Sequence, residues 1–381
     1  MNEPANGFEF LKLLRQQNGN QKQDYRYFTS YLDHKARQRR IPMWGQFELS
    51  PQCNLDCKMC YVHLNAEQLS GCSVLPPETW KELMRQAWEA GMVRATLSGG
   101  ECLMYPGFEE LYLYLHSLGC AVAVYTNGVL LDDKRVRFFT EHRPNRIQIT
   151  LYGHNDDVYE RVTGRRAFKT VDANIRKAVD AGLPVLIAIT PSKYLGEDVF
   201  ELLRFARGYG RPIAVSHSVF SPREETGRSA QKDDLSIDMH IRLDQMLSEL
   251  NGIEVKTIDE DKLPPYGGGA HTCTECGLTC GGGRSSFSID WKGTLSPCNR
   301  LDAIHADALH EGFKAAWDTV SREAANWPRV PECEGCAYRD VCYNCAAAML
   351  EFAEPGKQPI GLCEQTRYYV QHGIRRIPDC D

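Results

Sequence analysis

The sequence lacks three features, and each absence narrows the classes of protein that fit. No uninterrupted apolar run approaches the roughly 18 residues that a bilayer-spanning helix needs. The first residues do not follow the basic-then-apolar order of a secretory signal. A basic excess is also missing, because the net charge is −6, whereas nucleic-acid binders usually carry a strong positive charge. We therefore expect a cytoplasmic protein whose partners include neither a membrane nor a nucleic acid.

Cysteine, by contrast, is abundant, with 16 among the 381 residues. In a chain of this length without a secretory signal, so many cysteines indicate metal or redox chemistry rather than a disulfide framework. The cysteines are also clustered: three lie within 53–60, four within 273–298 and five within 333–363. These segments are therefore the candidate metal sites.

Apolar segments of strand length alternate with amphipathic segments of helix length through much of the chain. The expected strands are 46–49, 95–98, 121–126, 146–151, 184–190 and 213–220. The expected helices are 77–90, 108–118, 132–141, 171–181, 197–207 and 235–250. This alternation predicts an α/β fold with a parallel sheet and helical crossovers. We expect an N-terminal extension at 1–45, an α/β unit at 46–262 and a small cysteine-rich domain at 263–381.

The loops that follow the first three expected strands carry residues with chemical potential. Cys53 follows the first strand, Gly99-Gly100-Glu101 follows the second, and Asn127-Gly128 follows the third. In a barrel-like α/β fold, function lies at the carboxyl ends of the strands. The glycines would let the backbone approach a ligand closely, and the carboxylate could accept hydrogen bonds from an amino group. These loops are the predicted site.

The first cysteine cluster has the spacing Cys53-x3-Cys57-x2-Cys60. Three thiolates of such a loop can bind three irons of a cubane cluster and leave the fourth iron open. Soft thiolates select Fe–S clusters, zinc or Cu(I). Zinc normally takes a fourth ligand, which Cys72 or His63 could supply. The spacing favours an Fe–S cluster over zinc.

Four motifs, in this order and at these distances, resemble those of the radical S-adenosylmethionine (SAM) superfamily. They are Cys53-x3-Cys57-x2-Cys60, Gly99-Gly100-Glu101, Tyr125-Thr126-Asn127-Gly128, and the stretch from Tyr152-Gly153 to Val162-Thr163-Gly164. The resemblance covers residues 47–220 and implies a partial (β/α)6 TIM-like barrel that holds a [4Fe–4S] cluster. It also implies that SAM binds the open iron and is cleaved reductively to a 5′-deoxyadenosyl radical, which takes a hydrogen atom from the substrate.

The resemblance further implies which residues contact SAM. The predicted SAM-binding residues are Tyr61, Gly99, Gly100, Glu101, Gln148, Thr150 and Arg161. In this scheme Gly99 to Glu101 lie by the methionine amino group, Tyr61 lies by the adenine, and Gln148 and Thr150 reach the ribose or the carboxylate. Cys102 stands where the family usually has proline, and it is either a packed side chain or a reactive thiol near the site.

The C-terminal cysteines allow two interpretations. The run from Cys333 to Cys345 could form a zinc knuckle. Together with a hairpin expected at 288–295, however, residues 270–365 resemble the SPASM extension of radical SAM enzymes, which carries two auxiliary [4Fe–4S] clusters. By this resemblance the first auxiliary cluster is bound by Cys280, Cys298, Cys345 and Cys276 (or Cys273), and the second by Cys333, Cys336, Cys342 and Cys363. The implied total is three [4Fe–4S] clusters.

Enzymes of this build mostly modify peptides, so the predicted reaction is oxidative cross-linking, through a thioether or C–C bond, in ribosomal-peptide maturation. The expected partners are a peptide or protein substrate and an electron donor such as flavodoxin or ferredoxin. One alternative is formylglycine-type oxidation of a protein Ser or Cys. The enzymes of that type carry a carboxylate after the cysteine matching Cys298. This chain has Asn299 there, which leaves Asp290 and Asp302 as candidate catalytic bases.

Two further alternatives remain open at this point. One is oxidation or epimerisation of a small molecule such as an aminosugar. The other is a binding protein without catalytic activity, stabilised by zinc or by clusters.

Overall fold

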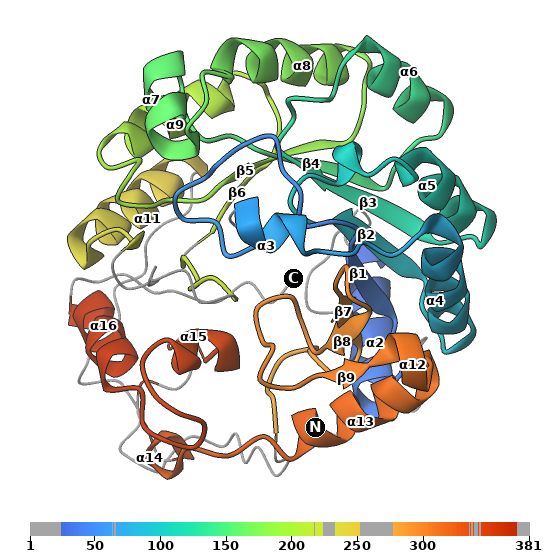
Figure 1. Ribbon diagram of the computed structural model, residues 1–381. Coiled ribbons are helices and arrows are strands. Elements are labelled where there is room, and N and C mark those ends of the chain that lie inside the picture. Colours follow the sequence, from blue (N-terminus) through green and yellow to red (C-terminus); the bar gives the residue numbers. More distant parts are fainter. Residues whose placement is uncertain are drawn as a thin grey trace.

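The structure is a computed structural model, and Figure 1 shows its course from the N-terminus to the C-terminus. It describes residues 24–371 except 63, 65, 217, 224–232, 252–276, 335, 337, 339–341 and 343. Within these ranges, none of the helices combines the length and apolarity needed to cross a membrane.

A single nine-stranded sheet organises the molecule, with the strand order β6-β5-β4-β3-β2-β1-β7-β8-β9. The strands are β1 Trp44–Glu48, β2 Arg94–Ser98, β3 Ala121–Thr126, β4 Arg146–Thr150, β5 Val185–Ile189, β6 Ile213–Val215, β7 Ser286–Ile289, β8 Thr294–Ser296 and β9 Ala306–Asp307. The first six strands pair in parallel, as the sequence predicts. The expected sixth strand is shorter than predicted, because pairing ends at Val215. The barrel is not closed, and β6 and β9 form the two edges of the sheet.

Helices cover the outer side of the curved sheet (Figure 1). The helices are α2 Asp24–Arg39, α3 Ala66–Ser70, α4 Pro77–Glu89, α5 Phe108–Ser117, α6 Asp133–Glu141, α7 Asp156–Thr163, α8 Phe168–Asp180, α9 Asp198–Arg207, α11 Ile237–Asn251, α12 Ala308–Glu311, α13 Phe313–Ala325, α14 Pro331–Glu334, α15 Ala346–Leu350 and α16 Ile360–Gln371. Phe47 and Leu97 occupy paired positions on the helix-covered side and are fully buried. The ring of Trp80 from α4 packs edge-on against Phe47 at 6.0 Å. Burial of such apolar side chains is the main stabilising contribution here.

The two faces of the sheet differ in chemistry, because side chains alternate along each strand. Gln46, Gln148 and Thr150 lie on the face opposite to the helix-covered one and remain partly exposed. The face of the sheet opposite to the helices therefore carries polar groups.

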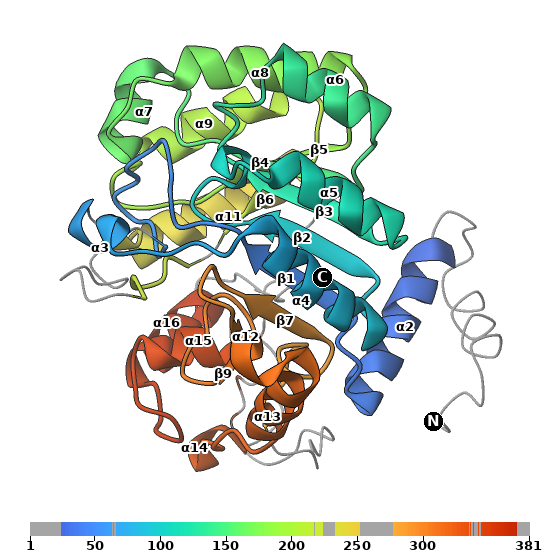
Figure 2. The same cartoon turned by 45° about the vertical axis from the view of Figure 1, so that its right-hand side comes forward.

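The C-terminal region is joined to the sheet rather than being separate from it. β7 pairs in parallel with β1, and the expected hairpin is formed by β7 and β8. Figure 2 shows this region packed below the sheet, with α13 beside the β7–β9 strands. The boundary that we predict between the second and third parts falls in 252–276, outside the described residues.

Helix α13 is not among the helices that the sequence predicts. Its buried face consists of Phe313, Ala316, Trp317, Val320, Ser321 and Ala324. Phe287 of β7 packs against Phe313 at 4.8 Å and against Trp317 at 6.1 Å between ring centroids. Residues 277–325 therefore have an apolar core of their own.

The N-terminal helix α2 packs against the same unit. Asp33 accepts a hydrogen bond from the Ser285 hydroxyl at 2.9 Å, and the indole of Trp317 donates to the Arg40 carbonyl at 3.0 Å. The extension thus contacts the C-terminal region in space.

Candidate active site

The loop that carries Cys53, Cys57 and Cys60 leaves the carboxyl end of β1 and is fixed by the end of helix α7. The backbone N–H of Asp56 donates to the Thr163 carbonyl at 2.9 Å, and that of Lys58 donates to the Val162 carbonyl at 3.0 Å. The last carbonyls of a helix have no partner within the helix, so the cysteine loop satisfies them. Backbone contacts therefore shape this loop without any bound group.

The surroundings of the three cysteines disfavour free thiolates. Burial, aided by the charges of Glu101 and Cys60, raises the pKa of the Cys53 thiol to about 12. Burial and the neighbouring Cys60 and Cys53 also raise the pKa of Cys57, although the Tyr152 hydroxyl hydrogen-bonds to its sulfur. Binding to a metal removes the protons and compensates the charges. The donor set therefore fits an Fe–S cluster, which takes thiolate ligands.

The arrangement of ligands also bears on the kind of metal centre. Within the described ranges, no three His, Cys, Asp or Glu side chains converge closely enough to bind a single metal ion. A cubane cluster does not require such convergence, because each of its irons takes one thiolate.

Gly99 and Gly100 make a close approach, but to protein backbone. Gly99 has a φ of +136°, and a Cβ there would lie 2.4 Å from the Ser50 carbonyl oxygen. A Cβ at Gly100 would lie 2.4 Å from the Gln52 carbonyl oxygen. The amide of Gly100 donates to Ser50 at 2.8 Å, and that of Glu101 donates to Gln52 at 2.8 Å. The glycines thus press the end of β2 against the segment leading to Cys53.

Glu101 is fully buried and already receives hydrogen bonds from the protein. Its Oε1 accepts from the Leu103 amide at 3.0 Å and from the Thr126 hydroxyl at 2.8 Å, while Oε2 accepts from the Asn127 amide at 2.7 Å. Burial nevertheless raises the pKa of Glu101. Its carboxylate joins the ends of β2 and β3, and a ligand would use the remaining acceptor capacity of Oε2.

Asn127 links the third strand to the cysteine loop, a role that the sequence analysis did not assign. Its Nδ2 donates to Asn54 Oδ1 at 2.7 Å and lies 3.6 Å from the sulfur of Cys53. The signal was present in the sequence, because Asn127-Gly128 ends an expected strand. Its partner is 73 residues away, so no local pattern could reveal it.

Tyr61 connects the first cysteine loop to the C-terminal region. The Asn299 side chain donates to the Tyr61 hydroxyl at 2.5 Å. Because Tyr61 follows Cys60 and Asn299 follows Cys298, this bond brings two cysteine loops together. The Arg223 guanidinium lies 5.3 Å from the centroid of the Tyr61 ring. Tyr61 is therefore held by protein contacts on its ring and at its hydroxyl.

The other predicted SAM contacts lie in two different places. Gln148 and Thr150 face inward on β4, opposite Leu186 and Ala188 of β5. Arg161 instead binds the segment before α9, since it donates to the Tyr194 carbonyl at 2.8 Å and pairs with Asp198. In the structure Arg161 therefore connects α7 to α9 and the segment before it.

The C-terminal cysteines form two groups. Burial raises the pKa of Cys298 to about 11, with added contributions from Cys280 and Cys345. The pKa of Cys342 is likewise raised by burial and by its neighbours Cys363 and Cys336. Cys345 is thus grouped with Cys298 and Cys280, and Cys342 with Cys363 and Cys336. Cys333 precedes Cys336 in the same turn. Cys273 and Cys276 lie outside the described residues.

The candidate bases Asp290 and Asp302 occupy turns. Asp290 Oδ1 accepts hydrogen bonds from the Lys292 and Thr294 amides at 2.9 and 3.0 Å, which shapes the β7–β8 hairpin. Asp302 is exposed.

Cys102 is buried, and its thiol donates to the Tyr125 carbonyl at 3.1 Å.

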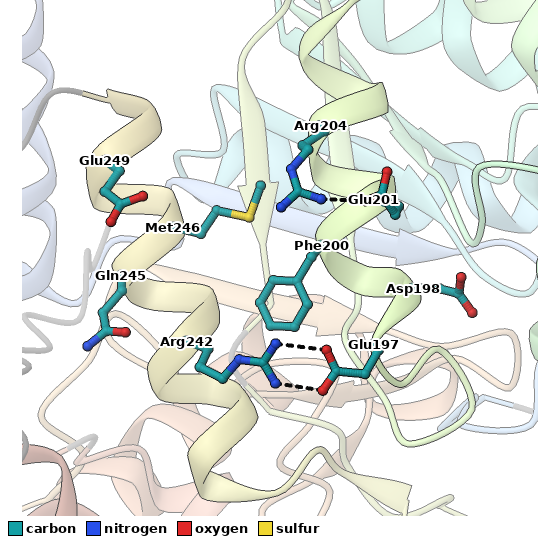
Figure 3. A pocket seen from close by; sticks show the side chains of 9 residues that line it. All are labelled: Glu197, Asp198, Phe200, Glu201, Arg204, Arg242, Gln245, Met246 and Glu249. Carbon is teal, nitrogen blue, oxygen red and sulfur yellow. Dashed lines mark hydrogen bonds and ion pairs between the residues drawn. The ribbon is translucent and has the colours of Figure 1, made fainter.

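A surface pocket between α9 and α11 contains none of the predicted site residues (Figure 3). It is lined by Glu197, Asp198, Phe200, Glu201, Arg204, Arg242, Gln245, Met246 and Glu249. Arg242 forms two hydrogen bonds with Glu197, and Arg204 pairs with Glu201. Both arginines of the pocket are therefore paired with carboxylates of the same pocket.

Comparison with known proteins identifies the class that this fold and site define. Residues 47–207 match the family model described as the Radical SAM superfamily. Residues 47–207 therefore form a radical SAM domain, which has the open parallel α/β fold and is followed by a cysteine-rich C-terminal region.

Individual relatives match between less than half and most of this chain. The sporulation killing factor maturation protein SkfB of Bacillus subtilis is 29% identical over 167 residues, which cover 43% of this chain and 39% of that protein. The AdoMet-dependent heme synthase of Methanosarcina barkeri is 25% identical over 329 residues, or 81% of this chain and 91% of that protein. The crystal structure of Streptococcus suis SuiB bound to precursor peptide SuiA is similar in fold, with 17% identity, a TM-score of 0.64 and coverage of 90% and 81%.

Proposed function

We propose that this radical SAM enzyme modifies a peptide, by oxidative cross-linking through a thioether or C–C bond. The observation that carries the proposal is the contact between Tyr61 and Asn299, which joins the loop of Cys60 to the loop of Cys298. A substrate bound there lies between a radical source and a second cysteine group that can hold an electron acceptor. The names of two relatives, a maturation protein and a structure with a precursor peptide, support a peptide substrate.

The residues proposed to hold the cofactors follow from the groups described above. Cys53, Cys57 and Cys60 would hold the first [4Fe–4S] cluster, which together with SAM supplies a 5′-deoxyadenosyl radical. Asn127 and the Gly99–Gly100 turn keep this loop in place. The auxiliary clusters would use the ligand sets given in the sequence analysis. An external flavodoxin or ferredoxin would supply the electron.

Formylglycine-type oxidation of a protein side chain is less well supported. Asn299 uses its amide as a donor to Tyr61, and an amide lacks the basicity to take a proton. A small-molecule substrate has a specific observation in its favour. The heme synthase relative matches over 91% of its own length, whereas SkfB matches over 39%.

Two measurements test the proposal. Reconstituted and reduced protein is expected to form 5′-deoxyadenosine from SAM and to contain about 12 Fe per chain, four for each cluster. Incubation with a short peptide encoded beside the gene is expected to remove two hydrogens per link, as read by mass spectrometry. An unmodified peptide, together with turnover of a tetrapyrrole or sugar, would favour the small-molecule reaction. Bound zinc, or about four irons, would contradict the auxiliary clusters.

A further inference from the structure

Three polar side chains gather where the Cys60 and Cys298 loops meet. Glu48, at the end of β1, is fully buried, and Arg223 Nη2 donates to its Oε1 at 2.7 Å. The same guanidinium lies 5.8 Å from the centroid of the Trp291 ring, which belongs to the β7–β8 hairpin. Arg223 also lies over Tyr61. One guanidinium thus brings together a carboxylate of the sheet and an indole of the C-terminal region.

Each of these side chains keeps one buried polar atom without a hydrogen-bond partner among the described residues. The unpaired atoms are Glu48 Oε2, Arg223 Nε and Trp291 Nε1. Buried polar groups nearly always have a partner, so three such atoms around one ion pair require an explanation. The first atom is an acceptor, and the other two are donors.

We propose that Glu48, Arg223 and Trp291 bind the backbone N–H and C=O of one residue of the peptide substrate. In an extended segment these two groups point to the same side, so Glu48 Oε2 accepts from the N–H, while Arg223 Nε and Trp291 Nε1 donate to the carbonyl oxygen. This inference rests on the proposed peptide substrate and names the group that positions it between the two cysteine loops.

A neutral amide fits this site better than a charged group. Glu48 and Arg223 already balance each other, and bringing a further unpaired charge into a buried site is strongly unfavourable. The three atoms are closed to solvent in this structure, so the amide enters when packed side chains shift. Arg223 is the side chain suited to move, since it is 18% exposed while Glu48 is 0% exposed.

An N-methyl scan of the peptide tests the proposal on the wild-type enzyme. The probe is the short peptide encoded beside the gene, with each amide methylated in turn, and the dissociation constant is measured in the presence of SAM. One position is expected to weaken binding roughly five- to tenfold, because methylation removes one hydrogen bond. A scan without a sensitive position would overturn the proposal without the need for any variant.

Two variants then identify the protein side of the contact. In Glu48→Gln the unmethylated peptide is expected to bind roughly fivefold more weakly, and the penalty at the sensitive position disappears. In Trp291→Phe binding also weakens, but the penalty remains, because the indole contacts the carbonyl oxygen. Trp88→Phe on the exposed face of α4 is the matched control and is expected to bind as the wild type does.

The outcomes separate this proposal from the proposed function. If the wild-type enzyme neither binds nor modifies the peptide, the peptide-modifying function itself is wrong. If it modifies the peptide, but Glu48→Gln and Trp291→Phe, with iron content and circular dichroism unchanged, bind as the wild type does, only the amide site is wrong.

Discussion

The two cysteine-bearing regions of this chain are built in opposite ways. The Cys53–Cys60 loop is fixed by backbone hydrogen bonds to the end of α7, and the segment that leads into it from β1 is fixed by backbone hydrogen bonds from the glycine turn. The segment from Pro331 to Cys363 contains the helices α14 and α15, of four and five residues, and the start of α16. Helices this short have little stability of their own. The first region is therefore shaped by the protein, and we infer that the second depends on its metal.

The change from a region shaped by protein contacts to one that we infer to depend on metal lies inside the C-terminal region. Residues 277–325 contain the β7–β8 hairpin and α13, whose aromatic contacts form a conventional core. Beyond Ala325 the helices are shorter, and cysteine side chains contribute contacts of their own. Thr366, for example, donates its hydroxyl to the sulfur of Cys342 at 3.5 Å.

Replacing Cys53, Cys57 and Cys60 together with Ala has the largest expected effect on activity. Formation of 5′-deoxyadenosine should be lost, and the iron content should fall from about 12 to about 8 per chain. Circular dichroism should change little, because backbone contacts shape the loop. The matched triple replacement of Cys336, Cys342 and Cys363 should remove a similar amount of iron and disorder its own segment. Equal structural damage in both variants would remove the contrast between the regions.

Removal of all iron with an anaerobic chelator should produce a local effect. Metal-dependent segments lose their folding free energy with the metal, so amides in 344–363 are expected to exchange almost as fast as in an unfolded chain. Amides in β2, β3 and β4 should remain protected. Hydrogen exchange read by mass spectrometry checks both. Continued protection of 344–363 without iron would mean that its packing suffices.

The sequence predicted the parallel sheet well, because each strand has its own apolar pattern and its own turn residues. Helix α13 was missed for a physical reason. Three of its six buried positions carry small side chains, Ala316, Ser321 and Ala324, so its apolar face gives a weak periodic signal.

The site was predictable only where its parts are close in sequence. Cysteine spacing pointed to the loops and the Gly99–Glu101 turn was recognisable as a motif. Contacts such as Glu48 with Arg223, 175 residues apart, follow from the fold alone. Gly99 and Gly100 illustrate the difference. The sequence predicted that the backbone approaches a neighbour closely at these glycines, but not that this neighbour is the backbone of Ser50 and Gln52.

Asn127→Ala sharpens the comparison by loosening the first loop without removing a ligand. The variant loses the bond to Asn54 and the contact with Cys53. Residues that support metal ligands typically contribute about tenfold or more in activity or metal affinity, so 5′-deoxyadenosine formation should fall about tenfold. Asn145→Ala, at an exposed position, is the control. Unchanged activity in Asn127→Ala would mean that the other backbone contacts hold the loop without help.

Cys102→Ala should have the smallest effect and decides between the two interpretations of that residue. Its buried thiol donates to the Tyr125 carbonyl at 3.1 Å and has a longer contact of 4.0 Å with Glu101 Oε1, so its loss should lower the free energy of unfolding by about 1 kcal/mol. Burial raises the pKa of this thiol well above its usual range, with Glu101 adding to the effect. The thiolate that reacts with alkylating reagents is therefore scarce. Urea unfolding and the rate of iodoacetamide labelling check both points. Rapid labelling of Cys102 in the folded protein, or loss of SAM cleavage in the variant, would show a reactive thiol at the site instead of a packed side chain.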